Sequence, residues 1–349
     1  MKKLVYLLLV LLVSLAFSAC KDLEDEDQMI TVIDMVGDEV TLMENPKKVA
    51  VIARAAADMM IGFGLGDVVD GMYQSILDNP WVEVFYPNAA NFHSYDYNES
   101  AELFLSRGVD LVLAPEKYIA EELRANGVTA ITVSLYGTPT YESVIYKIAD
   151  LIAQIWPRTE DKVSDWKEEL DQAIDDITSV LDTKTITPRT IHYVRGDKDR
   201  GLGYTDTAGS LVETVYESYF GLIYLGKSFE SNKPSIEEIM LQNPDIIVVG
   251  GAYQNKIIND ASTTEPQSLL DAFANNQVFN IPLGFVMWEQ NSIALPLFLY
   301  DQANKLYPEY FNFNIANKTQ ILFKEYFDVL LSDDDINRML HGFFPIDSI

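Results

Sequence analysis

The sequence predicts an α/β protein with two similar lobes, each built on a parallel-type sheet, and a single long α-helix that joins them. Three observations predict this fold class. Residues 159–183 carry apolar side chains at the period of one helix face, and nothing inside the segment would break a helix. Two units of one pattern lie on either side of that segment. In both flanking parts, strand-like runs alternate with helix-like periods, which favours parallel sheets covered by helices.

The long helix is predicted from six apolar residues that recur at steps of three or four. They are Val163, Trp166, Leu170, Ile174, Ile177 and Leu181. Acidic residues fall on the opposite face, and Thr159 is expected to be the N-cap, just after Pro157. At about 1.5 Å per residue this helix is about 37 Å long, which is enough to join two domains.

The internal repeat consists of a glutamate on a short predicted helix and, eight residues later, an aspartate that opens an apolar strand. Glu102 and Asp110 form one copy, and Glu237 and Asp245 form the other, 135 residues further along. Each strand then ends in a loop that contains Pro or Gly. Two such units around one long helix predict two similar lobes, although a chance similarity of two helix–strand units stays open as the alternative.

The remaining elements follow from local patterns. In the first half we expect a hairpin at 30–42, strands at 49–53, 67–72, 111–113 and 128–133, and a loop-rich part at 73–98. We also expect a helix that begins at Arg54 and ends near Gly64 or Gly66, and helices at 117–125 and 141–155. In the second half we expect strands at 190–194, 246–249 and 278–281, and helices at 208–219, 266–274, 293–306, 317–330 and 333–340.

Composition and charge limit the function. The chain has 349 residues, is 48% hydrophobic and carries a formal net charge of −28, so it can form two cores but suits neither nucleic acid nor a bare anionic membrane. Its three histidines lack metal-ligand spacing. The single cysteine, Cys20, cannot form an internal disulfide.

The N-terminus indicates export. Lys2 and Lys3 precede an apolar run from Leu4 to Phe17, which is short for a transmembrane helix, and small residues then lead to Cys20. This arrangement resembles a bacterial lipoprotein signal, although Phe17 stands where that family prefers Leu. The resemblance implies cleavage before Cys20 and lipid attachment to its sulfur; a plain signal peptide with an incidental cysteine is the alternative. Without residues 1–19 the net charge becomes −30.

A family resemblance covers nearly all of residues 29–342. It is carried by ITVIDMVGDEVTLMENPKKVAVI, by the two glutamate–aspartate units, by the long helix, and by GFVMWEQNSIALPLFLYDQANKLYPEYF. Together these resemble the substrate-binding proteins of bacterial ABC importers, in the class with two Rossmann-like α/β lobes bridged by one long helix. The predicted organisation is a signal peptide at 1–19, an acidic tether at 20–28, an N-terminal lobe at 29–156, the bridging helix at 157–183 and a C-terminal lobe at 184–349.

The resemblance implies a monomeric, extracytoplasmic binding protein, lipid-anchored to the outer face of the cell membrane or to the periplasmic side of a membrane. It would deliver a metal chelate to an ABC permease dimer with its ATPase. An iron-siderophore is expected first, ahead of haem, a corrinoid or a metal oxyanion. No cofactor of its own is expected, and the metal, iron first, would arrive with the ligand. The matching docking residues are Glu102 and Glu237, with Glu238 as a rival, and ordinary solvated helix charge is the alternative.

The ligand-binding residues are expected at the carboxyl ends of the strands, between the lobes. They are Arg54, Lys117, Tyr118, Arg195, Tyr204, Tyr253 and Trp288, the last followed by Glu289. Arginines bind anionic oxygens, and aromatic rings pack against a large flat chelate. Each residue also has an ordinary structural explanation, and Trp288 in particular could belong to the core. His192 is expected in the core, and His93 stays open.

No catalytic motif is found in the sequence: it has no Gly-x-Ser-x-Gly elbow, no phosphate loop and no His-Glu-x-x-His helix. A binding protein rather than an enzyme is therefore expected. Two hypotheses from other classes remain. One is a chelatase-like enzyme on a similar two-lobed fold, and the other is a surface-anchored receptor that has no permease.

Overall fold

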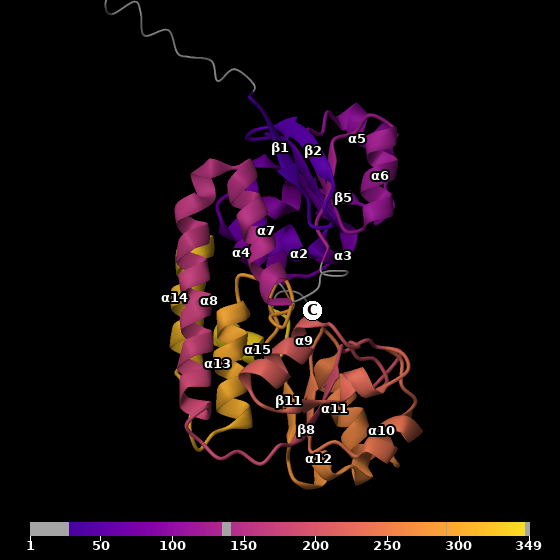
Figure 1. The fold of residues 1–349 in the computed structure, drawn as a ribbon, viewed down its shortest axis with the longest axis vertical. Coiled ribbons are helices and arrows are strands. Elements are labelled where there is room, and N and C mark those ends of the chain that lie inside the picture. Colours follow the sequence, from indigo (N-terminus) through magenta and orange to yellow (C-terminus); the bar gives the residue numbers. More distant parts are fainter. Residues whose placement is uncertain (1–27, 135–140, 291, 346–349) are drawn as a thin grey trace, which may run out of the picture.

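The computed structural model describes residues 28–134, 141–290 and 292–345, and it confirms the predicted fold class (Figure 1). Two α/β lobes with parallel sheets are connected by one long helix, α8 (Glu160–Leu181), which runs along one side of the molecule. The predicted signal peptide, Cys20 and all of the tether except residue 28 lie outside the described residues. None of the helices in the described ranges is long and apolar enough to cross a membrane.

The first lobe contains a five-stranded parallel sheet in the order β5-β4-β3-β6-β7. Its strands are β3 (Val49–Val51), β4 (Val69–Tyr73), β5 (His93–Tyr95), β6 (Leu111–Ala114) and β7 (Ala130–Thr132). Its helices are α2 (Arg54–Gly62), α3 (Gln74–Leu77), α4 (Trp81–Phe85), α5 (Ala101–Arg107), α6 (Lys117–Ala125) and α7 (Tyr141–Ile155). The predicted hairpin precedes the sheet as β1 (Met29–Ile33) and β2 (Glu39–Met43), which pair antiparallel.

The second lobe contains a four-stranded parallel sheet in the order β11-β10-β8-β9. Its strands are β8 (Thr190–Val194), β9 (Ile223–Tyr224), β10 (Ile246–Val249) and β11 (Val278–Asn280). Its helices are α9 (Leu211–Thr214), followed by a π-helical turn, α10 (Ile236–Gln242), α11 (Gln254–Thr263) and α12 (Asp271–Ala274). Helices α13 (Leu295–Leu306), α14 (Ile315–Phe327) and α15 (Asp333–Leu340) end the described chain.

Several local predictions were wrong. Residues 73–98 were expected to be loop-rich, but they contain α3, α4 and β5, because Trp81, Phe85 and Tyr95 are buried in the core. Helix α9 begins three residues later than predicted, since the side chain of Ser210 caps it by accepting from the backbone N–H of Glu213. The helix expected at 266–274 is interrupted by the extended Leu270, α14 ends at Phe327 rather than at 330, and α11 was not predicted.

Helix α8 buries the predicted face. Of the six apolar residues only Ile174 is half-buried, and the other five are buried. The indole N–H of Trp166 donates to the carbonyl oxygen of Ile293 at 3.1 Å, which ties α8 to the segment before α13. Thr159 is the N-cap of α8, as predicted, but its side chain does not cap the helix: its hydroxyl donates to the carbonyl oxygen of Trp156, within a 3₁₀ turn that leads into α8.

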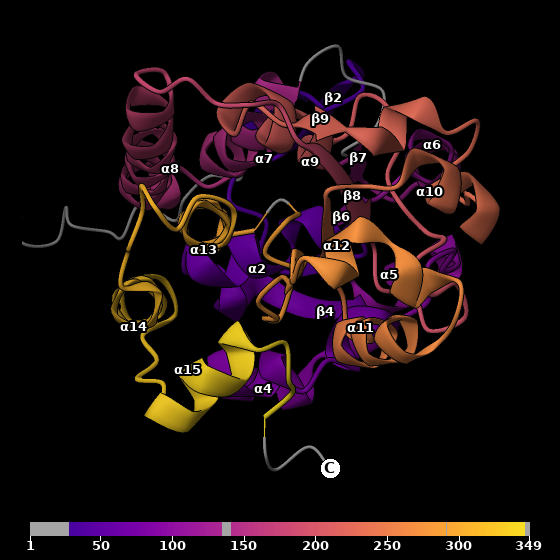
Figure 2. The same ribbon diagram turned by 90° about the horizontal axis from the view of Figure 1, so that it is seen from below.

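The C-terminal helices connect α8 to the first lobe (Figures 1 and 2). Helix α13 lies against α8, and α14 contacts α2. Phe323 of α14 stacks on Phe85 of α4, with ring centroids 4.6 Å apart. One hydrophobic cluster therefore includes residues of both lobes and of α8. Because packed interiors deform little, this shared core favours a small relative motion of the lobes.

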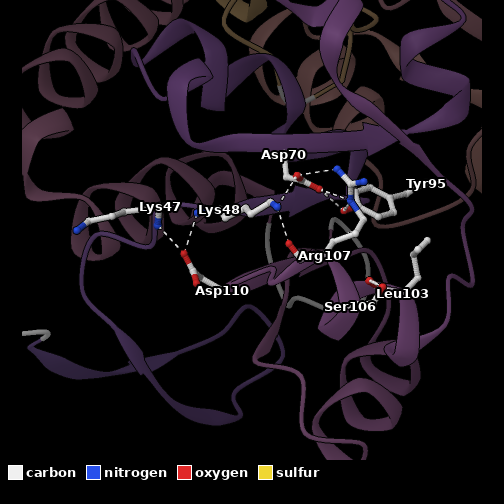
Figure 3. A network of polar contacts seen from close by, with 8 residues as sticks. All are labelled: Lys47, Lys48, Asp70, Tyr95, Leu103, Ser106, Arg107 and Asp110. Atoms are coloured by element: carbon white, nitrogen blue, oxygen red, sulfur yellow. Dashed lines mark hydrogen bonds and ion pairs between the residues drawn. The ribbon is translucent and has the colours of Figure 1, made fainter.

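The repeated aspartates have a common structural role. Asp110 accepts hydrogen bonds from the backbone N–H groups of Lys47 and Lys48, both at 2.9 Å, just before β3 (Figure 3). Asp245 accepts from the backbone N–H and the hydroxyl of Thr190, at 2.7 and 2.8 Å, at the start of β8. Each carboxylate thus accepts hydrogen bonds from backbone N–H groups at the start of the neighbouring strand. This shared contact supports the prediction of two similar lobes.

Candidate ligand-binding cleft

A cleft of about 600 Å³ lies between the two lobes, within the range typical of small-molecule sites. The first lobe contributes Arg54 and Asn79, and the second contributes Arg195, Tyr204 and Tyr253. The loop 283–290 closes the space between them. Four of the seven predicted ligand-binding residues therefore line one cavity.

The parallel register of the second sheet brings the cleft loops together. Val194 at the end of β8 pairs with Val249 at the end of β10, so the loops that follow both strands leave the same edge of the sheet. Gly196 has φ +73°, and a Cβ added there would lie 1.8 Å from the carbonyl oxygen of Gly250. Glycine at this crossing lets the backbones touch, which places Arg195 next to the loop that carries Tyr253.

Arg195 is held in place by its own lobe. Its guanidinium Nη1 donates to Asp206 Oδ1 at 3.0 Å, and its Cζ lies 5.1 Å from the ring centroid of Tyr204. Its backbone N–H donates to the carbonyl oxygen of Tyr204 at 2.8 Å. The guanidinium is therefore oriented before any ligand binds, although part of its charge is compensated by Asp206.

Arg54 presents a different kind of positive charge. It is the first residue of α2 and is exposed; its guanidinium donates to the hydroxyl of Ser75 and lies 5.4 Å from the ring centroid of Tyr73. Among the described residues no carboxylate lies within 4.0 Å of it, and the same holds for Lys198 across the cleft. These two cations can therefore attract an anionic ligand.

Three predicted ligand-binding residues lie elsewhere. Trp288 is fully buried, with its ring centroid 6.4 Å from that of Phe323, so it belongs to the core rather than to the cleft. Lys117 forms an ion pair with Asp38 of the hairpin at 2.7 Å. Tyr118 is 57% exposed and lines a groove together with Glu102. Both follow β6, but neither lines the cleft.

The loop 283–290 contributes cleft residues that sequence reasoning missed. Phe285, Met287 and Gln290 line the cavity, whereas the prediction selected the largest side chain of this segment, Trp288. The side-chain amide of Asn79 donates to the carbonyl oxygens of Gly284 and Phe285, both at 2.9 Å, and so fastens the loop to the first lobe. No local pattern separates the inward from the outward residues of such a loop.

Two carboxyl groups lie close behind Arg195. Glu289 is 1% exposed, and it accepts a hydrogen bond from the hydroxyl of Tyr193 at 3.0 Å through Oε1. Burial raises the pKa of the Glu289 carboxyl to about 7, with a smaller contribution from the charge of Asp206. Burial also raises the pKa of Asp206, against the opposing effect of Arg195. This part of the site is therefore poorly solvated and sensitive to added charge.

The histidines do not form a metal centre. His192 is buried in β8, where Nε2 bonds the carbonyl oxygen of Leu202 at 2.9 Å, and burial lowers the pKa of its ring to about 4. This confirms the expected core position. His93 lies half-buried in β5 with its ring against that of Tyr95. Within the described parts of the chain, no group of three His, Cys, Asp or Glu side chains is placed to hold a metal ion.

The two predicted docking glutamates occupy matching positions. Glu102 and Glu237 are each the second residue of a short helix whose N-cap serine, Ser100 or Ser235, accepts from a backbone N–H. Both glutamates are exposed, and α5 and α10 lie on the side of the molecule away from α8 in both views (Figures 1 and 2). The rival Glu238 has a structural task, because its carboxylate accepts from the N–H of Ser235 in a capping box.

A family model described as periplasmic binding protein matches residues 110–283, from the first sheet through the bridging helix and into the loop that closes the cleft. The chain belongs to the periplasmic binding protein family. No curated protein sequence matches it.

Solved structures share the fold of this binding protein at low sequence identity. A periplasmic solute binding protein from Veillonella parvula has a TM-score of 0.69 at 19% identity, covering 90% of this chain and 97% of that one. CeuE from Helicobacter pylori, in a complex with Ni-His, has a TM-score of 0.71 at 18% identity, covering 90% and 99%. MolA from Haemophilus influenzae, bound to molybdate, has a TM-score of 0.72 at 16% identity, covering 87% and 99%.

These similarities define the general function. The protein is a periplasmic binding protein, and the solved structures that share its fold include solute-binding proteins. A location outside the cytoplasm follows from membership of the family.

Proposed function

We propose that this binding protein captures a metal chelate, with an iron-siderophore as the first expectation, and delivers it to its permease. The observation that carries the proposal is the make-up of the cleft. Arg54 and Lys198 supply positive charge from opposite lobes, and Tyr204, Tyr253 and Phe285 supply aromatic surface. A ferric chelate presents oxygen atoms around the metal on a broad organic framework, which matches cationic donors set among rings.

The size of the cleft supports the chelate over a simple oxyanion. About 600 Å³ suits a drug-sized organic ligand, whereas a four-oxygen anion such as molybdate fills only a small part of that space. Haem and corrinoids remain the alternatives of the same class.

The proposal also includes how the protein is held and how it docks. Lipid attachment at Cys20 would keep the monomer at the membrane, because acyl chains give stable anchoring. Glu102 and Glu237 would pair with basic residues of the permease and set its orientation, since exposed charge pairs give register more than affinity. Their equivalent positions on the two helices support this assignment.

The test has two parts. Protein purified from its own host is analysed for metal content and for its absorbance spectrum, where a ferric chelate, haem and a corrinoid give different bands. Calorimetry then compares ferric trihydroxamate, ferric catecholate, haemin, cobalamin and molybdate. Binding of a ferric chelate, and weaker binding of the same chelator without iron, is the expected result. Binding of haemin, cobalamin or molybdate with no binding of either ferric chelate would refute the siderophore proposal.

A further inference from the structure

A second cavity of about 290 Å³ lies beside the cleft, inside the second lobe; we call it the side chamber. It shares three lining residues with the cleft, namely Arg195, Tyr204 and Gln290, so the two spaces are adjacent. The side chamber is too small for a chelate of the size that fits the cleft, but it can hold one arm of such a ligand.

The charges of the two spaces differ. The cleft is lined by three cationic side chains, those of Arg54, Arg195 and Lys198, and by the acidic Asp78 and Asp197. The charged residues that line the side chamber are Arg195 and two acids, Asp206 and Glu289. Asp206 already pairs with Arg195 at 3.0 Å, so the chamber has no uncompensated positive charge to offer an anion.

The buried carboxyl of Glu289 is a second reason, independent of the chamber's charge, to expect a ligand group there. Its side chain is almost completely buried, Oε1 accepts from Tyr193, and Oε2 has no hydrogen-bond partner among the described residues. A buried carboxyl oxygen without a donor is costly, and the arrival of a donor removes that cost. Glycine at position 250 leaves room for this carboxyl, because a Cβ added there would lie 2.1 Å from Oε1. The carboxyl, bonded to Tyr193, forms part of the chamber wall.

We propose that the side chamber is a subsite for a hydrogen-bond-donating, cationic arm of the ligand, such as a primary ammonium group. Asp206 and Glu289 receive this arm, while the electron-rich body of the chelate faces Arg54 and Lys198 in the cleft. This inference rests on the proposed function, and it narrows the ligand to a dipolar chelate rather than a uniformly anionic one.

The test uses two probes that differ only at the arm. One is the ferric complex of a linear trihydroxamate with a terminal primary amine, and the other is the same complex after N-acetylation. Calorimetry gives the ratio of their dissociation constants. The natural protein is expected to bind the ammonium form at least about tenfold more tightly, because a hydrogen bond to a charged group contributes more than that in a dry site.

Variants assign the preference to the chamber. Thermal unfolding first shows which of the two single variants, Asp206→Asn and Glu289→Gln, is folded. In a folded variant the ratio of the two dissociation constants is expected to move toward one. Asp199→Asn is the matched control, because Asp199 is an exposed acid of the same lobe that lines neither cavity. The ratio of the two dissociation constants should therefore be the same in this variant as in the natural protein.

Two results would overturn the inference and leave the chelate proposal intact. One is equal binding of both probes by the natural protein. The other is a change of the ratio in Asp199→Asn as large as the change in the Asp206 and Glu289 variants. If neither ferric complex binds, the proposed ligand class fails, and the arm subsite fails with it.

Discussion

Replacing Asp70 with Asn should destabilise the first lobe more than any exposed charge substitution. Asp70 lies in β4, its side chain is 7% exposed, and both carboxylate oxygens are bonded by Arg107 of α5 at 2.8 Å (Figure 3). It also accepts from the hydroxyl of Tyr95 and lies 3.4 Å from the ammonium of Lys48. This network fastens α5, the helix that carries Glu102, to the sheet.

The magnitude follows from the burial of this network. Breaking a fully buried ion pair by removing one charge costs about 3–5 kcal/mol. Because the side chains of Arg107 and Lys48 are 31% and 41% exposed, solvent screens part of this, and we expect about 2–3 kcal/mol for Asp70→Asn. Burial opposes ionisation of Asp70, but the hydrogen bonds and charge of Arg107 outweigh it, so its pKa lies below the usual value.

The sign of the pH dependence follows from that shift. A carboxyl whose pKa is lower in the folded state contributes stability above its unfolded value of about 3.9, and the contribution is lost as the pH falls through the folded value. The difference between the natural protein and Asp70→Asn should therefore be full at pH 7 and should shrink below about pH 4.

The matched control is Asp67→Asn. Asp67 pairs with Arg158 at the same distance of 2.8 Å, but both side chains are about half exposed or more. Its replacement should cost less than about 1 kcal/mol. Guanidinium unfolding at pH 7 measures both variants, read as a shift of the midpoint at constant slope. Equal losses for the two variants would refute the reasoning from burial.

The other predictions concern transport, ligand binding, acidity and shape. Reversing both docking charges, with Glu102→Lys and Glu237→Lys, should abolish uptake of the ligand by cells while calorimetry shows normal affinity; normal uptake would favour a receptor without a permease. Arg54→Gln should weaken ferric-chelate binding by about tenfold, as expected for one charged hydrogen bond, whereas Arg158→Gln should leave it unchanged. Burial raises the pKa of Asp58 to about 7, above its unfolded value, so its contribution to stability is full below about pH 4 and is lost as the pH rises to 7. The free energy of unfolding of Asp58→Asn should fall less steeply over this pH range than that of the natural protein. An identical pH profile for the two proteins would contradict the raised pKa. X-ray scattering profiles with and without ligand should nearly overlay, because Asp58 and Trp166 form hydrogen bonds with the two backbone groups of Ile293 and so fasten the segment between the cleft loop and α13 to the first lobe and to α8. A large contraction on binding would contradict this.

The sequence by itself determined the elements that depend on local periodicity and capping. The face of α8, the boundaries of α7 and α15, and the strands around Asp110 and Asp245 were predicted nearly as observed, because burial of one face and satisfaction of terminal backbone groups are settled within a few residues. The positions of Arg54 and Arg195 at the cleft were also predicted, since Arg195 directly follows β8 and Arg54 comes three residues after the end of β3.

Only the tertiary structure decided which side chains of the irregular segments face the cleft. Trp288 and Phe285 are three residues apart in one loop, yet the first packs into the core and the second lines the cavity. The return of α14 to the first lobe, and the closeness of Asp206 and Glu289 behind Arg195, likewise depend on contacts between residues that are far apart in sequence. Such contacts are fixed by the packing of whole elements, which no local pattern records.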